Sequence, residues 1–367
     1  MRHDLPPPAP VPLDPRRVRH GGRLLLCFAG SDYLRRSWSP ALRAALARAL
    51  ARWGPDAAAS RVTTGNLPVY GAAERALARF AGTAEAVLTS SGYTAPLVAA
   101  QALAPGCDQI WIPDGTHPCL RDAARLTGLP TTTVSLAKAA PTRRGHPALF
   151  LEGLGALNGR VPPLREWLDW LPPNGRLLLD DAHGVGTRGT RGRGIRETLA
   201  VDDPRVVLAF TLSKAFGLAG GVVAGHRGIA AAIWKHSTLQ RASTPIPPPY
   251  AAVVPMAADW MARHGAGPRR RLALLAARLA RRIPGIGHDH AGPVFLAVPL
   301  SPEARAGFRR RLLEAGIFPS FIRYPGVPGD GAFRFALGTA HTMDDVDALG
   351  DAIETEWRRA PSAWRLG

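Results

Sequence analysis

From about residue 70 onward, short apolar runs alternate with segments of helical periodicity. The apolar runs predict strands at residues 86–89, 109–112, 131–135, 148–151, 176–179 and 206–210. The helical segments between the first of them lie at residues 72–81, 95–103 and 118–127. Continuous apolar strands separated by helices are typical of βαβ units. The pattern therefore predicts an α/β fold with a mostly parallel sheet that is covered on both faces.

The pattern changes after the proline-rich stretch PIPPP at residues 245–249. A long helical region reaches about Arg282, and further elements are expected at residues 294–298, 302–315 and 333–337. Before the alternating region lie a proline-rich stretch at residues 1–20, a strand at 23–28 and a helix at 39–53. We therefore predict an N-terminal arm (1–40), a large domain (41–244) and a smaller α+β C-terminal domain (245–367).

The composition narrows the class of protein. The three cysteines form no Cys-x-x-Cys pair, so neither a disulfide framework nor a metal site is expected. The N-terminus lacks the apolar run of a signal peptide, and no apolar stretch is long enough to span a membrane. We expect a cytoplasmic protein.

The net charge of +18 raises the possibility of a nucleic-acid partner. The cations, however, are scattered, and the densest group at residues 268–282 also places Leu272, Leu275 and Leu279 on one helical face. This pattern is typical of a packed amphipathic helix with a basic outer face. We expect no nucleic-acid partner, although the basic surface would suit an anionic substrate or an acidic carrier protein.

One lysine stands out. Among 46 Lys and Arg residues only three are lysine, yet Lys214 is the one charge in the apolar stretch 206–225. An arginine cannot lose its proton in a protein, whereas a desolvated lysine can become a nucleophile or form an imine. The other interpretation is a lysine at a strand end whose amine reaches solvent.

A second polar group follows the apolar strand 176–179. Asp180, Asp181 and His183 come directly after it, as Lys214 comes after the strand at 206–210, so a carboxylate, an imidazole and an amine would meet at one sheet edge. We interpret Asp181 as a structural hydrogen-bonding residue. Pyridoxal 5'-phosphate (PLP) needs such a set, and the turn at residues 89–96 could bind its phosphate at a helix N-terminus.

Two segments carry a resemblance to a known family. Residues 180–186 (DDAHGVG) and 211–217 (TLSKAFG) resemble the motifs of the α-oxoamine synthases, which are fold-type-I PLP-dependent transferases. The resemblance extends from about residue 28 to residue 347. Other matching segments are SDYL at 31–34, SGY at 91–93, DGTH at 114–117, EG at 152–153, ST at 243–244 and FRFAL at 333–337.

The resemblance implies a role for four residues around the cofactor ring. Lys214 would form an imine with the cofactor and transfer protons. Asp180 would pair with the pyridine nitrogen, and His183 would reach the phenolic oxygen. His117 would stack on the ring face.

The resemblance also implies the remaining contacts. The amides of Gly92 and Tyr93 would bind the phosphate together with Thr211. Thr244 would bind it from the partner subunit of a homodimer, and Arg334 would bind the substrate carboxylate.

Three segments depart from the family's pattern. Ser31 replaces an asparagine near the substrate, and Ala156 replaces the serine of the Glu-Gly-x-x-Ser segment. The glycine-rich loop of the family is PDAAAS here, at residues 55–60. Alanines in place of glycines make that loop stiffer and bulkier where the acyl donor would enter.

The resemblance implies a decarboxylative condensation of an α-amino acid with an acyl thioester, carried by coenzyme A or an acyl carrier protein, to an α-amino ketone. An aminotransferase would use the same Lys214, Asp180 and His183 but would release no carbon dioxide. A histidine at the stacking position favours the first reaction. A non-enzymatic basic binding protein on the same fold is the third alternative.

Overall fold

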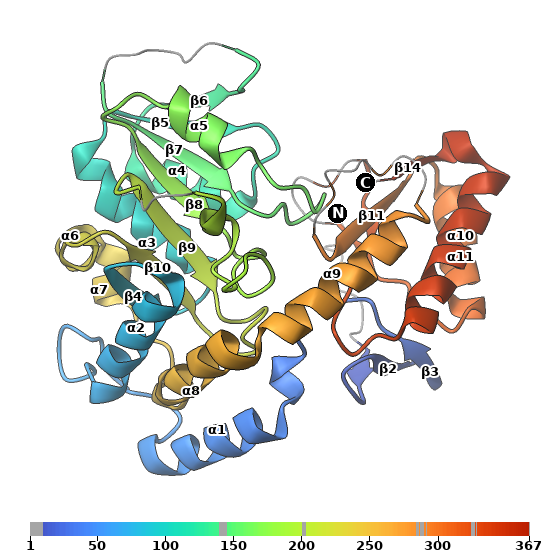
Figure 1. The fold of residues 1–367 in the computed structure, drawn as a ribbon, viewed down its shortest axis with the longest axis horizontal. Coiled ribbons are helices and arrows are strands. Elements are labelled where there is room, and N and C mark those ends of the chain that lie inside the picture. The colour runs from blue at the N-terminus through green and yellow to red at the C-terminus, as the bar shows by residue number, and fades with distance from the viewer. Residues whose placement is uncertain are drawn as a thin grey trace, which may run out of the picture.

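The computed structural model describes residues 10–138, 145–199, 203–283, 286, 290, 292–323, 327 and 329–366 (Figure 1). Two sheets dominate the molecule: a large one in the first two thirds of the chain and a smaller one near the C-terminus. The first nine residues of the predicted arm lie outside the described residues. No helix in the described ranges is long and apolar enough to cross a membrane.

The large sheet has seven strands in the order β4-β10-β9-β8-β7-β5-β6. Its strands are β4 (Glu85–Thr89), β5 (Gln109–Pro113), β6 (Thr131–Val134), β7 (Pro147–Glu152), β8 (Arg176–Asp180), β9 (Val206–Thr211) and β10 (Gly221–Gly225). The β6, β5, β7, β8 and β9 strands are mutually parallel, whereas β10 runs antiparallel to both of its neighbours. The predicted mostly parallel α/β sheet is therefore confirmed.

Both faces of this sheet are buried. In β8, Leu177 and Leu179 belong to one apolar core, while Leu178 between them belongs to a second core on the opposite face. The helices around the sheet are α2 (Pro68–Ala81), α3 (Thr94–Leu103), α4 (Pro118–Thr127), α5 (Leu164–Trp170), α6 (Ile229–His236) and α7 (Thr238–Ala242). Burial on both sides explains why these strands are continuously apolar in the sequence.

Local sequence signals fix several helix ends. The α1 helix (Pro40–Trp53) begins with Ser39, whose side chain accepts a hydrogen bond from the Leu42 amide, and ends at Gly54, with φ 72°. The α4 helix begins after His117 with proline at its first position and ends at Gly128, with φ 70°. The ends of α4 coincide with those predicted from the sequence.

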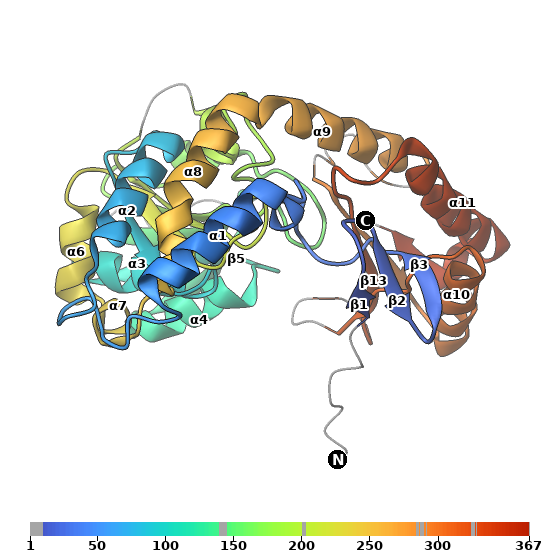
Figure 2. The ribbon, with the colours of Figure 1, turned by 90° about the horizontal axis from the view of Figure 1, so that it is seen from below.

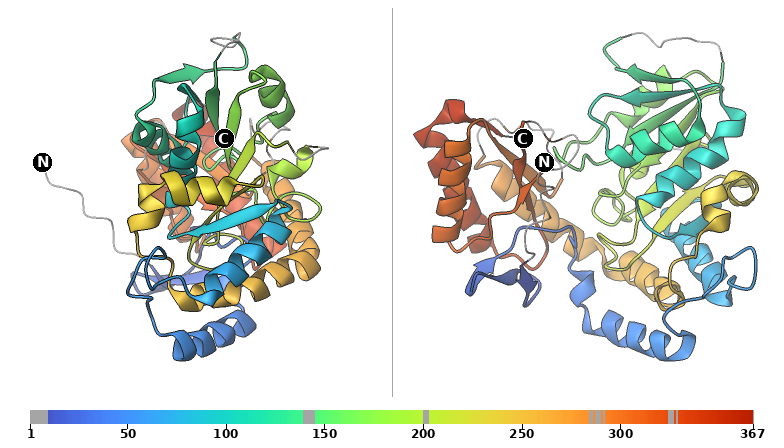
Figure 3. Two further views of the ribbon diagram at one scale, coloured as in Figure 1. Left: turned by 90° about the vertical axis from the view of Figure 1, so that its left-hand side faces the viewer. Right: turned by 180° about the vertical axis from the view of Figure 1, so that it is seen from behind.

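Two long helices connect the two sheets. In Figure 2, α8 (Pro248–His264) lies beside α1 over the large sheet, and α9 (Ala266–Ala280) extends from it to the C-terminal sheet. The smaller sheet has the order β12-β13-β11-β14, from β11 (Val294–Pro299), β12 (Phe321–Ile322), β13 (Ala332–Ala336) and β14 (Trp364–Leu366). The α10 (Pro302–Glu314) and α11 (Met343–Arg359) helices lie together on its outer side (Figure 3).

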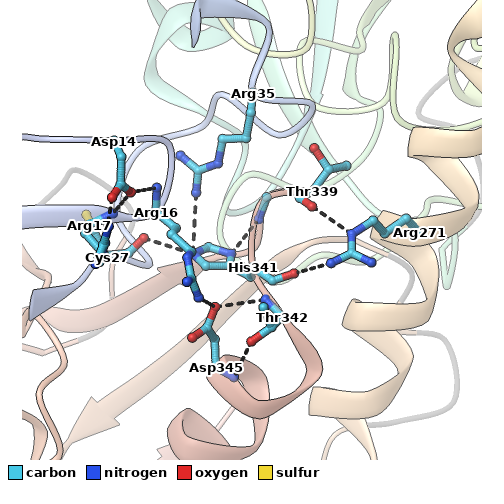
Figure 4. A network of polar contacts seen from close by, with 11 residues as sticks. Asp14, Arg16, Arg17, Cys27, Arg35, Arg271, Thr339, His341, Thr342 and Asp345 are labelled. Atoms are coloured by element: carbon cyan, nitrogen blue, oxygen red, sulfur yellow. Dashed lines mark hydrogen bonds and ion pairs between the residues drawn. The ribbon is translucent and has the colours of Figure 1, made fainter. Parts of the chain in front are cut away.

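The N-terminal strands lie against this C-terminal part. They are β1 (Val11–Pro12), β2 (Arg17–His20) and β3 (Arg23–Leu26), and a bridge joins Leu26 to Ile317. Figure 4 shows the contacts that hold this junction together around His341. The His341 ring accepts a hydrogen bond from the Gly338 amide and donates one to the carbonyl of Cys27. Arg271 of α9 donates to the carbonyls of Thr339 and His341.

The predicted helical region that reaches about Arg282 is confirmed, and the structure divides it into two helices. The chain turns between them at Gly265, where a Cβ would lie 2.5 Å from the Met261 carbonyl oxygen. The antiparallel β10 and the C-terminal α11 were not predicted from the sequence. Short 3-10 helices complete the fold: η1 (Arg36–Trp38), η2 (Ala104–Gly106), η3 (Ile195–Thr198) and η4 (Pro361–Ala363).

Candidate active site

A cavity of about 270 Å³ lies at the carboxyl edge of β7, β8 and β9. Its lining comes from residues far apart in the chain, and it includes seven of the residues that the sequence nominated, among them Lys214, Asp180 and His183. The lining residues are Ser91, Gly92, Tyr93, His117, Cys119, Glu152, Asp180, Ala182, His183, Thr211, Ser213 and Lys214. Ligands of open α/β sheets bind at this edge.

Lys214 follows β9 and reaches the cavity. Burial lowers the pKa of its amine to about 8, although the carboxylate of Asp180 acts in the opposite direction. The positive charge of Arg334 lowers this pKa further. A substantial fraction of the amine is therefore neutral at mildly alkaline pH, which a nucleophilic lysine requires.

Asp180 is the last residue of β8 and is buried. Its carboxylate accepts hydrogen bonds from the thiol of Cys119 at 3.1 Å and from the amide of Ala182 at 3.2 Å. In the neighbouring β7, Glu152 is the register partner of Asp180. Burial raises the pKa of Glu152 to about 7, so a fraction of this carboxyl group is protonated at neutral pH.

Asp181 has a different role from Asp180. It is fully buried, and its carboxylate accepts hydrogen bonds from the amides of Leu154 at 3.1 Å and Ile195 at 2.6 Å. Burial raises its pKa to about 6. It joins the loops that follow β7 and β8, which is the hydrogen-bonding role predicted for it.

The two histidines approach the cavity from different elements. His183 follows β8, is buried, and lies with Nδ1 2.6 Å from the hydroxyl of Tyr33. His117 is the N-cap residue of α4, and its Nδ1 lies 2.9 Å from the sulfur of Cys119. Burial lowers the pKa of both imidazoles.

The donor atoms of His117, Cys119 and Asp180 lie within 4.8 Å of one another, close enough to share a metal ion. They line the same cavity as Lys214. That the site holds no metal stays a prediction.

The predicted phosphate site lies at the start of α3. Gly92 packs against Thr211 so closely that a Cβ there would lie 2.4 Å from the Thr211 Cβ, so only glycine fits. The hydroxyl of Thr211 is 2.8 Å from that of Ser213. Hydroxyl groups facing a helix N-terminus form a cradle that suits an anion. Together with the buried amine and the carboxylate, this cradle fits PLP.

Three predicted residues lie outside the cavity lining. Arg334 in β13 donates a hydrogen bond to the Gly30 carbonyl at 3.3 Å, and Ser31 lies in the same N-terminal loop. Arg334 still influences the cavity, because its charge lowers the pKa of Lys214 and of His183. Thr244 lines a separate small pocket together with Ser90. The structure therefore brings the ring and phosphate residues together but not Thr244.

Sequence reasoning did not assign Cys119, Tyr33 and Ser213 to the site. Cys119 stands two residues after His117, and Ser213 directly precedes Lys214, so proximity in the sequence could have indicated both. Tyr33 belongs to the SDYL segment, but only the fold shows that its hydroxyl meets His183.

Comparison with known proteins identifies relatives along nearly the whole chain. The family model for aminotransferase class I and II matches residues 32–353. The 8-amino-7-oxononanoate synthase of Anaeromyxobacter dehalogenans is 34% identical, over 96% of this chain and 91% of that protein. A putative 8-amino-7-oxononanoate synthase of Desulforudis audaxviator is 31% identical, over 94% and 93% of the two chains.

Solved structures share the fold. Serine palmitoyltransferase of Sphingomonas wittichii superposes with a TM-score of 0.86 at 23% identity, covering 96% of this chain and 92% of that one. A serine palmitoyltransferase of S. paucimobilis, with a TM-score of 0.87 at 21% identity, was solved with PLP bound. The match along the chain and the shared fold lead to one conclusion: the protein belongs to the aminotransferase class I and II family of PLP-dependent enzymes, as a member of its α-oxoamine synthase group.

Proposed function

We propose that the protein condenses an α-amino acid with an acyl thioester, with loss of carbon dioxide, to give an α-amino ketone. The supporting observation is the convergence of Lys214, Asp180, His183 and His117 on one cavity beside a phosphate cradle. Relatives named 8-amino-7-oxononanoate synthase at up to 34% identity support the same reaction class.

Lys214 is proposed to hold the cofactor and to move protons. With a pKa of about 8, its amine can bind the aldehyde carbon of PLP and later accept the proton from the α-carbon of the substrate. The neighbouring Asp180 keeps the amine from becoming fully neutral at physiological pH, since its negative charge raises the pKa of Lys214. The lysine can therefore act as both base and acid.

PLP, when bound, supplies an electron sink for the negative charge that develops at the α-carbon. Asp180 is proposed to face the pyridine nitrogen of PLP, where its carboxylate would stabilise a proton on that nitrogen. The bonds from Cys119 and Ala182 fix the orientation of that carboxylate. His183 would donate to the phenolic oxygen, and His117 would lie on the ring face.

Gly92, Tyr93 and Thr211 are proposed to hold the phosphate at the N-terminus of α3. Thr244, at the start of the PIPPP segment, would serve the site of a partner subunit, so we propose a homodimer. In its own chain Thr244 lines a small pocket with Ser90, separate from the cavity that Lys214 lines.

Arg334 is proposed to bind the carboxylate of the amino acid, with Ser31 near it. The arginine lies within electrostatic reach of Lys214, so a carboxylate there would sit near the amine that receives the proton. Loss of that carboxylate as carbon dioxide would follow attack on the thioester.

We propose coenzyme A or an acyl carrier protein as the thioester carrier, since both are acidic and the chain carries a net charge of +18. A cytoplasmic location is proposed, in keeping with three cysteines that are all free. The predicted limits at residues 40 and 244 are proposed as domain boundaries.

The test is mass spectrometry of reactions that contain the PLP-loaded protein, a mixture of amino acids and a series of acyl-coenzyme A thioesters. A product mass equal to amino acid plus acyl group minus carbon dioxide is expected, and it would identify both substrates. Keto acids formed by amine exchange alone would instead establish an aminotransferase. A carrier-protein donor series would be run in parallel, and failure of both series would overturn the proposal.

A further inference from the structure

The hydroxyl of Tyr33 is buried and lies beside His183, one of the residues that line the candidate active site. Tyr33 is 1% exposed and lies in the loop before η1, while His183 follows β8 and is 7% exposed. The phenol oxygen and the Nδ1 of His183 are 2.6 Å apart, and the two rings are tilted against each other with centroids at 5.9 Å.

The direction of this hydrogen bond follows from the state of the phenol and from the length of the bond. Burial raises the pKa of Tyr33, so the phenol keeps its hydrogen, although the positive charge of Arg334 acts in the opposite direction. The 2.6 Å between the phenol oxygen and Nδ1 is shorter than the usual range for an N–H donor and falls within the range for an O–H donor. The phenol therefore donates its hydrogen to Nδ1 of His183.

The charges around His183 keep its ring neutral. Burial lowers its pKa well below the usual value, and the groups facing it, Lys214, Arg334 and His117, lower it further. A neutral imidazole carries one proton, and a ring whose Nδ1 accepts must carry that proton on Nε2. Among the described residues no protein atom bonds to Nε2, and His183 lines the cavity.

Ala156 stands where the family has serine, and its backbone amide is already bonded to the Glu152 carboxylate at 2.7 Å. This position therefore supplies no hydroxyl donor, and His183 is the residue that we propose as the donor to the phenolic oxygen of the cofactor.

We propose that Tyr33 is a positioning residue that donates a hydrogen bond to Nδ1 of His183 and so fixes the His183 proton on Nε2, where it can reach the cofactor. The proposal rests on the proposed binding of PLP in this cavity. Without the Tyr33 hydroxyl, either ring nitrogen of His183 can carry the proton. The hydrogen bond from His183 to the phenolic oxygen of PLP is then partly lost.

The test is the pH midpoint of the visible absorbance of bound PLP, which does not depend on turnover. Tyr33→Phe should raise this midpoint by about one pH unit, because a donor that stabilises the deprotonated cofactor is weakened. Tyr70→Phe is the matched control: Tyr70 is equally buried and donates to the Ile246 carbonyl at 2.8 Å, and its loss should leave the midpoint unchanged.

A double-mutant cycle separates positioning from a general structural effect. In a His183→Asn background, Tyr33→Phe should produce no additional shift. An equal shift in both backgrounds, or none in the single variant, would overturn the inference. If Tyr33→Phe failed to fold, the imidazole ¹⁵N shifts of the wild-type protein, assigned with His183→Asn, should place the His183 proton on Nε2, and a proton on Nδ1 would overturn the inference.

The two proposals fail in distinguishable ways. A wild-type protein that shows no visible absorbance with PLP would overturn both. A wild-type protein with the absorbance and a Tyr33→Phe variant with the same midpoint would overturn only the role of Tyr33.

Discussion

Two buried histidines, one at each of the two sheets, show how differently the same side chain is used. His341 at the C-terminal junction is fully buried and stacks on Phe28 with ring centroids 4.3 Å apart. Both of its ring nitrogens are bonded to backbone groups, at 3.0 Å and 3.1 Å. His183 at the catalytic edge has one nitrogen bonded to Tyr33, while its ring lines the cavity.

Burial lowers the pKa of both imidazole rings, so burial alone does not distinguish the two histidines. They differ in the groups that their ring nitrogens contact. At the junction in Figure 4, the ring joins the N-terminal strands to the loop before α11, and its bonding is complete within the protein. At the catalytic edge, bonding within the protein leaves an atom available to a ligand. Substitutions in the first region should therefore change stability, and those in the second should change chemistry.

The largest effect is expected at Lys214. Lys214→Ala should abolish both the covalent attachment of PLP and product formation. Lys214→Arg keeps the positive charge but cannot provide a neutral amine, so it should be equally inactive. Intact-protein mass after borohydride reduction measures attachment, and a reduced adduct on either variant would contradict the assignment.

Asp180 and Asp181 give the sharpest test of the contrast between a side chain that affects the chemistry and one that stabilises the fold. Asp180→Asn should lower kcat/KM by at least about 100-fold with little change in Tm, since the charge that we propose to face the ring nitrogen of the cofactor is lost.

Asp181→Asn should mainly reduce stability, by about 1–3 kcal/mol, because its carboxylate holds buried backbone amides. Steady-state kinetics and urea unfolding on both variants provide the comparison. Equal losses of stability in the two variants would remove the distinction.

The junction should show a pH dependence of stability. The pKa of His341 in the folded protein is lowered from 6.5 to about 4 by burial. Its stabilising contribution is present above pH 6.5 and is lost as the pH falls towards 4, by up to about 3 kcal/mol.

The raised pKa values of Glu152 and Asp181 act in the opposite direction, so the difference between wild type and His341→Gln is the quantity to measure. Urea unfolding should show that the two proteins converge in stability as the pH falls. A difference that does not change with pH would contradict the buried neutral state of His341.

A smaller effect concerns the pH at which PLP attaches. The rate of attachment to the cofactor-free protein should rise as the pH increases through about 8 and then level off, because the neutral amine of Lys214 reacts. Asp180→Asn should move this midpoint to lower pH, since Asp180 raises the pKa of Lys214. Stopped-flow absorbance measures the rate, and an unmoved midpoint would argue against contact between the two charges.

Much of the fold could be predicted because strong local signals mark it. The β9 strand is apolar at nearly every position and is buried throughout, and α4 has proline at its start and glycine at its end. The antiparallel β10 was missed because its glycine-bounded sequence has no helix before it to indicate a new strand. The turn at Gly265 was missed because both flanking segments have good helical periodicity.

The residues predicted to surround the cofactor ring and the phosphate could be assigned to one site, because their motifs follow strands that end at the same edge of the large sheet. The contacts that tune them could not be placed, because they join distant parts of the chain. Tyr33 is 150 residues from His183, and Cys119 is 61 residues from Asp180. Such pairs depend on packing between elements, which a single sequence does not specify.

The most direct test of the proposed reaction is the stoichiometry of its two by-products, carbon dioxide and the free thiol of the acyl carrier. With the amino acid that gives a product, carboxyl-labelled with ¹³C, the released carbon dioxide and the free thiol from the acyl donor are measured in one reaction. Equal amounts of both are expected with the wild-type protein, and neither with Lys214→Ala. Release of thiol without labelled carbon dioxide, or amine exchange without either, would contradict a decarboxylative condensation.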